Sequence, residues 1–386
     1  MEFLLDGIMA VLGPGGWKMI AMYIVGIALI VLAVKKEYEP SLLLPRGFGA
    51  ILVNLPYSGV IDQLVQNKVE AAGIIQWLFE VGIEASEAMP ILLFIGIGAM
   101  IDFGPLLSQP VLFLFGAAAQ FGIFAAILIA CLMGFDLKDA ASIGIIGAAD
   151  GPTSILVTQV LGSNYMGPIA VAAYSYMALV PIIQPFAIKL VTTKKERCIH
   201  MQYNPGDVSR GMRIAFPIAV TIIVGFISPQ SVALVGFLMF GNLLRECGVL
   251  HSLSQAAQNE LANIITLLLG ITISFSMRAE QFVNPATLMI MALGLVAFVF
   301  DTIGGVLFAK VVNVFLKMAG KPPVNPMIGG CGISAFPMSS RVVQKMAAEA
   351  EPGNIILMQA AGTNVSGQVA SVIAGGLVIS IVTQYL

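Results

Sequence analysis

Asp150 is the residue with the clearest chemical potential in this sequence. It lies in the segment GAADGPTS, residues 147–154, and is the only charged residue between Asp139 and Lys189. The surrounding apolar residues are typical of a membrane segment, where a buried carboxylate costs about 3 kcal/mol or more. Such a carboxylate needs a cation, a proton or a hydrogen-bonding partner. A hydrogen-bonded structural aspartate is the alternative interpretation.

The residues that follow Asp150 would supply more oxygen ligands. Gly151-Pro152 is expected to interrupt a helix and to free backbone carbonyl groups, and Thr153 adds a hydroxyl group. Carboxylate, carbonyl and hydroxyl oxygens together suit a hard cation such as Na⁺. The pattern therefore predicts a Na⁺ site at this interruption.

A second group of polar residues lies near the C-terminus. Arg341 presents a fork of donors that matches a carboxylate, although it could instead end a helix at the membrane surface, with Lys345 one turn further on. Asn364 and Ser366 lie in the charge-free stretch 354–386, where packing between helices is the competing explanation.

The composition indicates that these residues sit in a polytopic α-helical membrane protein. Of the 386 residues, 58% are hydrophobic and only 10% are charged, whereas soluble domains have about 25% charged residues. A net charge of -2 argues against nucleic-acid binding. Four cysteines without a CxxC pair make zinc, haem and a disulfide framework poor interpretations.

Apolar runs and basic loops predict a multi-pass protein of the plasma membrane. Basic residues concentrate in loops 35–46, 194–213 and 310–321, which we expect on the cytoplasmic side. Acidic residues interrupt 57–89, so the path of that segment stays open. The expected membrane segments are 19–34, 91–101, 111–133, 141–161, 168–191, 214–227, 231–244, 261–276, 285–300, 326–340 and 355–382.

Helix-breaking residues indicate an internal repeat. Residues 91–183 laid over 265–373 align Gly96 with Gly270 and Pro152 with Pro337, with one insertion between them. If 141–161 and 326–340 each enter and leave on one side, the two units are inverted repeats. We therefore predict an all-α, transporter-like bundle with two broken re-entrant helices that meet near the bilayer midplane. Its expected parts are an N-terminal segment 1–88, a first repeat 89–192, a connecting region 193–260 and a second repeat 261–386.

Five motifs resemble those of the β subunits of the biotin-dependent, sodium-pumping decarboxylases. The resemblance covers the chain from about residue 15 to the C-terminus. The motifs are GIGAMIDFGPLLSQP (96–110), GAADGPTSI (147–155), GNLLRECGV (241–249), NPMIGGCGISAFPMSSRVVQKM (325–346) and GTNVSGQVAS (362–371).

The resemblance implies roles for particular residues. Asp150 corresponds to the family's Na⁺ aspartate, which also serves in the proton-consuming decarboxylation, and Asn364 lies opposite it. Ser334 and Arg341 correspond to residues that handle the ion or carboxybiotin, and Tyr176 matches a family tyrosine by spacing only. Asn325 and Gly329 correspond to functional positions in the second re-entrant region. The expected set is therefore Asp150, Ser334, Arg341 and Tyr176 for catalysis, Asn325, Gly329, Ser334 and Arg341 for carboxybiotin, and Asp150, Asn364, Thr153 and Ser366 for Na⁺.

The resemblance also implies the function. It predicts an enzyme subunit that decarboxylates carboxybiotin and couples this step to Na⁺ export, within an oxaloacetate or acyl-CoA decarboxylase complex. The implied partners are biotin carrier and carboxyltransferase subunits, a small membrane subunit and further copies of this chain, and the biotin is carried by a partner. A stand-alone Na⁺/H⁺ antiporter or Na⁺-coupled carboxylate transporter is the alternative, because it would also use Asp150, Asn364 and two broken helices.

Overall fold

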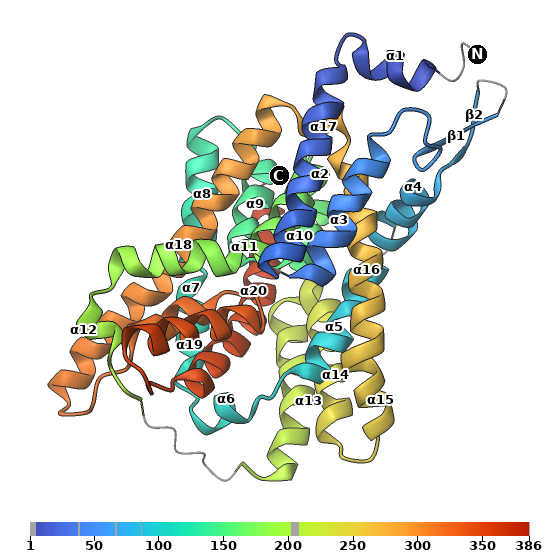
Figure 1. The fold of residues 1–386 in the computed structure, drawn as a ribbon. Coiled ribbons are helices and arrows are strands. Elements are labelled where there is room, and N and C mark those ends of the chain that lie inside the picture. The colour runs from blue at the N-terminus through green and yellow to red at the C-terminus, as the bar shows by residue number, and fades with distance from the viewer. Residues whose placement is uncertain (1–4, 38, 66–67, 86, 202–207, 386) are drawn as a thin grey trace.

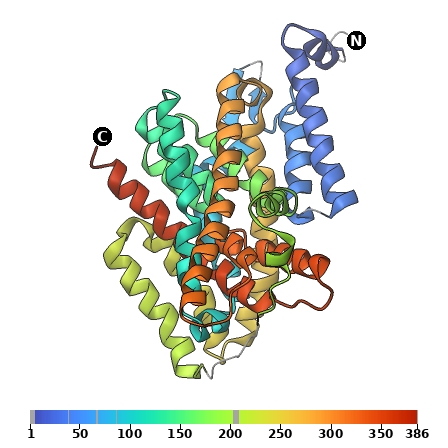
Figure 2. The same ribbon diagram turned by 90° about the vertical axis from the view of Figure 1, so that its left-hand side faces the viewer.

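The structure is a computed structural model that describes residues 5–37, 39–65, 68–85, 87–201 and 208–385. The described chain is mainly helical, and the predicted all-α polytopic architecture is confirmed (Figures 1 and 2). One antiparallel hairpin, formed by β1 (Asp62–Val65) and β2 (Lys68–Ala72), interrupts the helical pattern.

Seven helices among the described residues are long and apolar enough to cross a membrane. Each coincides with an apolar run predicted from the sequence, because a spanning helix needs about 20 apolar residues. An eighth candidate is a helix pair, 74–84 and 88–100, that is bent by 66°. The seven are α2 (Gly16–Lys36), α7 (Leu112–Ala119) with α8 (Phe121–Leu132), α11 (Met166–Val191), α13 (Arg210–Ile227), the stretch His251–Met277, α18 (Pro285–Met318) and α20 (Leu357–Val382).

Shorter helices complete the bundle, and the stretch His251–Met277 is itself divided. It contains α15 (His251–Ala256), η5 (Ala257–Leu261), α16 (Ala262–Ile273) and η6 (Ser274–Met277). The other described helices are α1 (Asp6–Leu12), α3 (Pro40–Val53), α4 (Ile74–Phe79), η2 (Glu80–Glu84), α5 (Ala88–Met100), α6 (Gly104–Ser108), α9 (Leu137–Gly144), η3 (Ile145–Ala148), α10 (Gly151–Val160), α12 (Lys194–Arg197), η4 (Pro229–Ser231), α14 (Val232–Glu246), α17 (Ala279–Phe282), η7 (Pro326–Gly332) and α19 (Met338–Ala350).

Helices at corresponding places in the two predicted repeats pack against each other in opposite directions. Near one end of the α5–α16 pair the Thr272 hydroxyl lies 3.9 Å from the Met89 sulfur, and near the other end Gly96 touches Ala262. The α7–α8 helix runs antiparallel to α18, which descends through the bundle in Figure 1. Opposed directions of this kind are what an inverted repeat produces.

Both predicted re-entrant elements are interrupted, and the interruptions touch. In the first, the 3₁₀ turn η3 ends at Ala148, and Ala149, with a φ of 53°, turns the chain before Asp150, the residue that precedes α10. In the second, an extended stretch around Ser334 separates η7 from α19. The Ser334 N–H donates to the Ala148 carbonyl oxygen at 2.9 Å. This contact joins the two broken elements at a single point.

Close glycine packing holds the second broken element against α18. A Cβ added to Gly329 would lie 2.0 Å from the Gly305 carbonyl oxygen, and a Cβ on Gly305 would lie 2.1 Å from that of Gly329. Both obstacles are backbone atoms, so no side-chain rotation could relieve the overlap. Glycine at both positions therefore lets η7 lie directly on α18.

Two of the three basic loops are shorter than predicted. Residues 40–46 form the start of α3, and Arg46 is fully buried, with its Nη1 group donating to the Ser175 hydroxyl at 3.0 Å. Pro40 favours this early start because proline is well accommodated in the first helical turn. The loop predicted at 310–321 is mostly helix, since α18 continues to Met318. Of the third, 194–213, residues 202–207 lie outside the described part of the chain.

The segment 57–89, which the sequence left open, contains the hairpin followed by a helix. The helix α4 passes through the π-helical turn η2 toward α5, and the bend of 66° lies between η2 and α5. The segment therefore ends as half of a broken helix and not as a straight crossing.

Candidate functional site

Asp150 lies at the start of α10 with its carboxylate turned into the protein. It is 3% exposed, and its Oδ2 atom accepts hydrogen bonds from the Thr153 hydroxyl at 2.6 Å and the Ser371 hydroxyl at 3.3 Å. Thr153 belongs to the first turn of α10, whereas Ser371 comes from α20. The carboxylate therefore connects α10 with α20, and the predicted ligand Thr153 lies beside it.

Ser334 and Asn364 contribute oxygens near the same break. The Ser334 hydroxyl is close to the Asp150 carboxylate but makes no hydrogen bond. The Asn364 amide donates to the carbonyl oxygens of Ile333 at 2.8 Å and Cys331 at 3.3 Å, while its Oδ1 atom is buried without a partner. Buried polar atoms are normally satisfied, so these oxygens are available to a ligand.

The donor set around this break suits a hard monovalent cation. It offers the Asp150 carboxylate, the Ser334 hydroxyl, the Asn364 amide oxygen and the Thr153 hydroxyl, all of them oxygen atoms. Within the described residues, no group of three or more His, Cys, Asp or Glu side chains could hold a metal. Oxygen donors with one formal charge match Na⁺ better than Zn²⁺ or another transition metal.

Ser366 and Ser371 lie on different sides of α20. The Ser366 hydroxyl donates to the Phe113 carbonyl oxygen of α7 at 3.1 Å, whereas Ser371 reaches Asp150. Ser371 is seven residues after Asn364, about two helical turns, so these two share a face of α20. The structure therefore brings Ser371 to the site, and the predicted ligand Ser366 packs against α7. The seven-residue spacing was the available signal for Ser371.

The two tyrosines of α11, Tyr174 and Tyr176, also face different parts of the protein. The Tyr174 ring lies on Gly151, where an added Cβ would come within 2.3 Å of the ring, and its hydroxyl is buried without a partner. The Tyr176 hydroxyl donates to the Met291 carbonyl oxygen of α18. Tyr174 therefore borders the break at Asp150, while the predicted catalytic residue Tyr176 faces another helix.

Arg46 also lies over the Tyr174 ring. Its guanidinium carbon is 5.6 Å from the ring centroid, and its Nε and Nη2 atoms are buried without a hydrogen-bond partner. A fully buried arginine in an apolar bundle is a costly feature that the sequence interpretation, which placed Arg46 in a loop, did not foresee.

Asp301 is another buried carboxylate, 0% exposed, and was not predicted from the sequence. Its Oδ1 atom accepts the Ile123 N–H at 3.1 Å in the first turn of α8. Its Oδ2 atom has no partner and faces Gly147, where an added Cβ would lie 2.6 Å away. The predicted apolar run ended at Phe300, so the continuation of α18 past Asp301 was the missing information.

Asn325 and Gly329 hold the second broken element in place. The Asn325 amide donates to the carbonyl oxygens of Arg197 and Ile199, both at 2.9 Å, which ties η7 to the segment around α12. Gly329 packs on α18, as described above. Both residues therefore support the broken element, and neither lines the cavity beside Arg341.

Arg341 lies in the first turn of α19 and borders a cavity of about 310 Å³. This volume is at the lower end of ligand pockets, which begin at about 300 Å³. Arg341 is only seven residues from Ser334, so one short segment connects the cavity with the Asp150 site. The cavity is lined by Glu37, Glu39, Pro40, Pro181, Met338, Arg341 and Val342.

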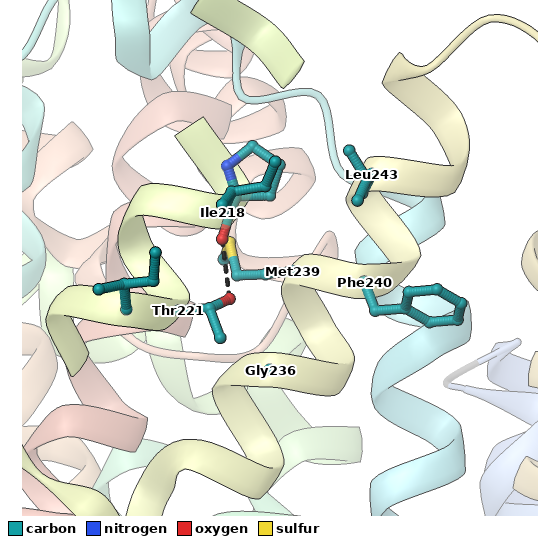
Figure 3. A pocket seen from close by; sticks show the side chains of 8 residues that line it. Ile218, Thr221, Gly236, Met239, Phe240 and Leu243 are labelled. Atoms are coloured by element: carbon teal, nitrogen blue, oxygen red, sulfur yellow. Dashed lines mark hydrogen bonds between the residues drawn. The ribbon is translucent and has the colours of Figure 1, made fainter. Parts of the chain in front are cut away.

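A second cavity, of about 260 Å³, lies between α13 and α14 (Figure 3). Its lining contains no charged residue, and its one hydroxyl, that of Thr221, donates to the Pro217 carbonyl oxygen at 2.8 Å. It therefore offers nothing to a cation or an anion. Its lining residues are Pro217, Ile218, Thr221, Ile222, Gly236, Met239, Phe240 and Leu243.

Comparison with known proteins gives a consistent result along almost the whole chain. The family model described as Na⁺-transporting oxaloacetate decarboxylase beta subunit matches residues 18–382. Methylmalonyl-CoA decarboxylase subunit beta of Propionigenium modestum is 45% identical over 94% of each chain. Glutaconyl-CoA decarboxylase subunit beta of Acidaminococcus fermentans is 44% identical over 95% of this chain and 94% of that protein. Oxaloacetate decarboxylase beta chain of Klebsiella pneumoniae is 41% identical over 94% of each chain.

Proposed function

The chain belongs to the family of Na⁺-transporting oxaloacetate decarboxylase beta subunits, and from this premise we propose that it decarboxylates carboxybiotin and couples that reaction to Na⁺ export. The observation that carries the proposal is the Asp150 carboxylate in a helix break between two repeats, beside buried oxygens without partners. The alternative of a stand-alone transporter would use the same break, but the relatives named above are decarboxylase subunits.

In this proposal Na⁺ is the transported substrate, held at Asp150. Thr153, Ser371, Asn364 and Ser334 supply oxygens from three elements of the two repeats. A site built between repeats can change its access from one membrane face to the other when the repeats move relative to each other. The antiparallel packing of α5 with α16 and of α7–α8 with α18 is the arrangement that two inverted repeats would produce.

Carboxybiotin would occupy the cavity beside Arg341. Its carboxylate is an anion, and the Arg341 guanidinium can bind such a group through two parallel hydrogen bonds. The cavity is also lined by apolar residues, among them Pro181, Met338 and Val342. Where these apolar side chains shield the carboxylate from water, loss of CO₂ would be favoured, because the carboxylate is less well solvated there than in water.

Coupling would pass through the segment between Ser334 and Arg341. Its first residue reaches the Asp150 break through the hydrogen bond to Ala148, and its last borders the cavity. If Na⁺ and carboxybiotin both contact this segment, each can shift the same equilibrium between two arrangements of the repeats. The binding of either substrate would then favour the same arrangement of the repeats.

The proposed partners are a biotin carrier subunit, a carboxyltransferase subunit, a small membrane subunit and further copies of this chain. The acyl substrate is determined by the carboxyltransferase. The chain aligns with the methylmalonyl-CoA relative over 382 positions and with the oxaloacetate relative over 414, at 45% and 41% identity. The shorter alignment and higher identity favour an acyl-CoA decarboxylase.

Reconstituted Na⁺ transport tests the proposed function directly. In proteoliposomes that contain the purified complex, a carboxylated biotin carrier should drive uptake of ²²Na⁺, and avidin should block substrate-driven uptake by trapping the biotin. If ²²Na⁺ uptake depended only on a pH gradient and was unaffected by avidin or by the carboxylated carrier, the alternative of a Na⁺/H⁺ antiporter would be favoured.

Two serines of α20 provide a matched pair for the Na⁺ site. Ser371→Ala removes a hydroxyl that reaches Asp150, so we expect the Na⁺ concentration for half-maximal decarboxylation to rise about 3- to 10-fold, from a hydrogen bond worth about 0.5–1.5 kcal/mol. Ser366→Ala removes a hydroxyl that reaches Phe113 and should leave this concentration unchanged. If Ser366→Ala raised this concentration and Ser371→Ala did not, Ser366 would be the Na⁺ ligand.

A further inference from the structure

The bend between η2 and α5 contains a buried carboxylate that the proposed function does not use. Glu87 comes directly before α5 and is only 5% exposed. Its side chain does not cap α5, and its Oε2 atom is buried without a hydrogen-bond partner. Among the described residues, no basic side chain lies within ion-pair distance of this carboxylate. A buried carboxylate of this kind in a membrane protein is a candidate binding site for a cation.

This carboxylate lies on the predicted outer side of the bundle. In Figure 1, α13 begins at the lower end of the molecule, in the basic loop 194–213 that we expect in the cytoplasm, whereas β1, β2 and α4 lie at the upper end. The chain runs from α4 through η2 into α5, so Glu87 lies at the end of α5 that faces the hairpin. Glu87 is therefore placed between the interior of the bundle and the predicted outer face.

The helix α10 leads from Asp150 to the same bend. It begins directly after Asp150, and Gln159 lies nine residues later in its last turn, which corresponds to about 13 Å along a helix. The Gln159 amide donates to the Glu84 carbonyl oxygen of η2 at 2.7 Å, while its Oε1 atom is buried without a partner. Gln159 therefore brings a second unpartnered oxygen to the bend that contains Glu87.

Tyr174 on α11 is close to both carboxylates. Its ring covers Gly151, the residue after Asp150, and its Cζ atom, which carries the hydroxyl group, would be 2.3 Å from a Cβ added there. The charged side chains that act on this hydroxyl group are those of Asp150, Arg46 and Glu87. The hydroxyl group is itself buried without a partner. Unpartnered oxygens therefore extend from the Asp150 site to the bend.

We propose that Glu87 and Gln159 form an exit site for Na⁺, an inference that rests on the proposed function. A Na⁺ ion that leaves Asp150 toward the outside would bind the Glu87 carboxylate and the Gln159 amide oxygen, with the Tyr174 hydroxyl group beside its path. Oxygen donors of this kind suit Na⁺, and a negative charge offsets the cost of moving a cation through an apolar region. The role of Asp150 in decarboxylation is unchanged by this proposal.

Na⁺ inside proteoliposomes tests the exit site separately from the Asp150 site. When the complete complex is reconstituted with its cytoplasmic face outward, the lumen corresponds to the outer side, and Na⁺ loaded there should inhibit decarboxylation by occupying the exit site. The substrate is the carboxylated biotin carrier, and K⁺ with valinomycin keeps the membrane potential near zero.

Glu87→Gln should separate the two sides of the membrane. We expect the luminal Na⁺ concentration for half-maximal inhibition to rise about 10-fold or more, because a charged ligand is lost. The external Na⁺ concentration for half-maximal activation should change less than twofold, since Asp150 is intact. A loss of structure alone would not act on one side of the membrane only.

Glu80→Gln is the matched control. Glu80 lies in η2, on the same side of the membrane, and its Oε1 atom accepts the Gln76 amide at 2.7 Å. Its substitution removes the same charge and should leave both Na⁺ concentrations unchanged. Gln159→Met, which removes the amide oxygen, should raise the luminal concentration about 3- to 10-fold. Glu87→Asp keeps the charge and should retain most of the luminal inhibition, and it serves with Gln159→Met if Glu87→Gln fails to assemble.

Four outcomes would overturn the inference. They are a luminal concentration in Glu87→Gln within twofold of the unchanged protein, an equal shift in Glu80→Gln, an equal shift of the external concentration in Glu87→Gln, and no luminal inhibition of the unchanged complex. In each case the unchanged complex would still decarboxylate carboxybiotin in a Na⁺-dependent way, so the proposed function would stand. Failure of the unchanged complex to do so would instead reject the proposed function itself.

Discussion

Asp150→Asn is expected to abolish Na⁺-dependent decarboxylation while leaving carboxyl transfer to biotin intact. The substitution keeps the size of the side chain but removes the one formal charge among the oxygens at the helix break. Loss of a charged partner costs about 3 kcal/mol, which corresponds to about 10²-fold or more in rate. In the proposed complex, carboxyl transfer would take place on a partner subunit and would not involve this carboxylate.

Asp102→Asn is the matched control for this experiment. Asp102 is also an aspartate close to the end of an apolar helix, but it is partly exposed, accepts the Gly104 N–H at 2.8 Å and lies 3.7 Å from Arg245. Its replacement should leave Na⁺ transport nearly unchanged. The measurements are ²²Na⁺ uptake into proteoliposomes and formation of carboxylated biotin. Normal pumping by the Asp150→Asn protein would remove Asp150 from the Na⁺ site.

Arg341→Gln is expected to raise the KM for the carboxylated biotin carrier about 10- to 100-fold, with a smaller effect on kcat. A hydrogen bond to a charged group contributes about 1.5–3 kcal/mol, and glutamine cannot replace the paired donors or the positive charge. Steady-state rates at several carrier concentrations would separate the two parameters. The low affinity should persist at saturating Na⁺, because the cavity and the Asp150 site are distinct.

Lys345→Gln is the control for Arg341. It lies one turn further along α19, is exposed and does not line the cavity. If Arg341 only ends a helix at the membrane surface, the two substitutions should have similar small effects on activity. A selective rise of KM in Arg341→Gln would distinguish substrate binding from that structural role.

Much of the fold was predictable because it depends on local properties of the chain. Apolar runs of about 20 residues identify spanning helices regardless of their neighbours, and all seven long helices coincide with predicted runs. Gly151-Pro152 indicated a helix break for the same local reason. Asp150 could be identified as a candidate because no other charge lies near it in the sequence.

The residues that surround Asp150 could not be predicted in the same way. Ser366 and Ser371, or Tyr174 and Tyr176, are equivalent as residue types in apolar helices, yet only one of each pair borders the Asp150 break. Residues two apart on a helix, such as the tyrosines, point about 200° apart, and residues five apart, such as the serines, about 140° apart. Which of them faces the site depends on how the helix is rotated against its neighbours, and that rotation is set by packing.

Charges that meet across the fold were the least accessible to sequence reasoning. The sequence pattern placed Arg46 in a basic loop together with Lys35 and Lys36. In the structure Arg46 belongs to α3 and is buried beside Tyr174. Glu39 and Arg341 come from opposite ends of the chain and line one cavity. The sequence alone determined that this is a helical membrane protein with a carboxylate at a helix break. Only the tertiary structure decided which side chains surround that carboxylate, because contacts between distant helices depend on the packing of the whole bundle.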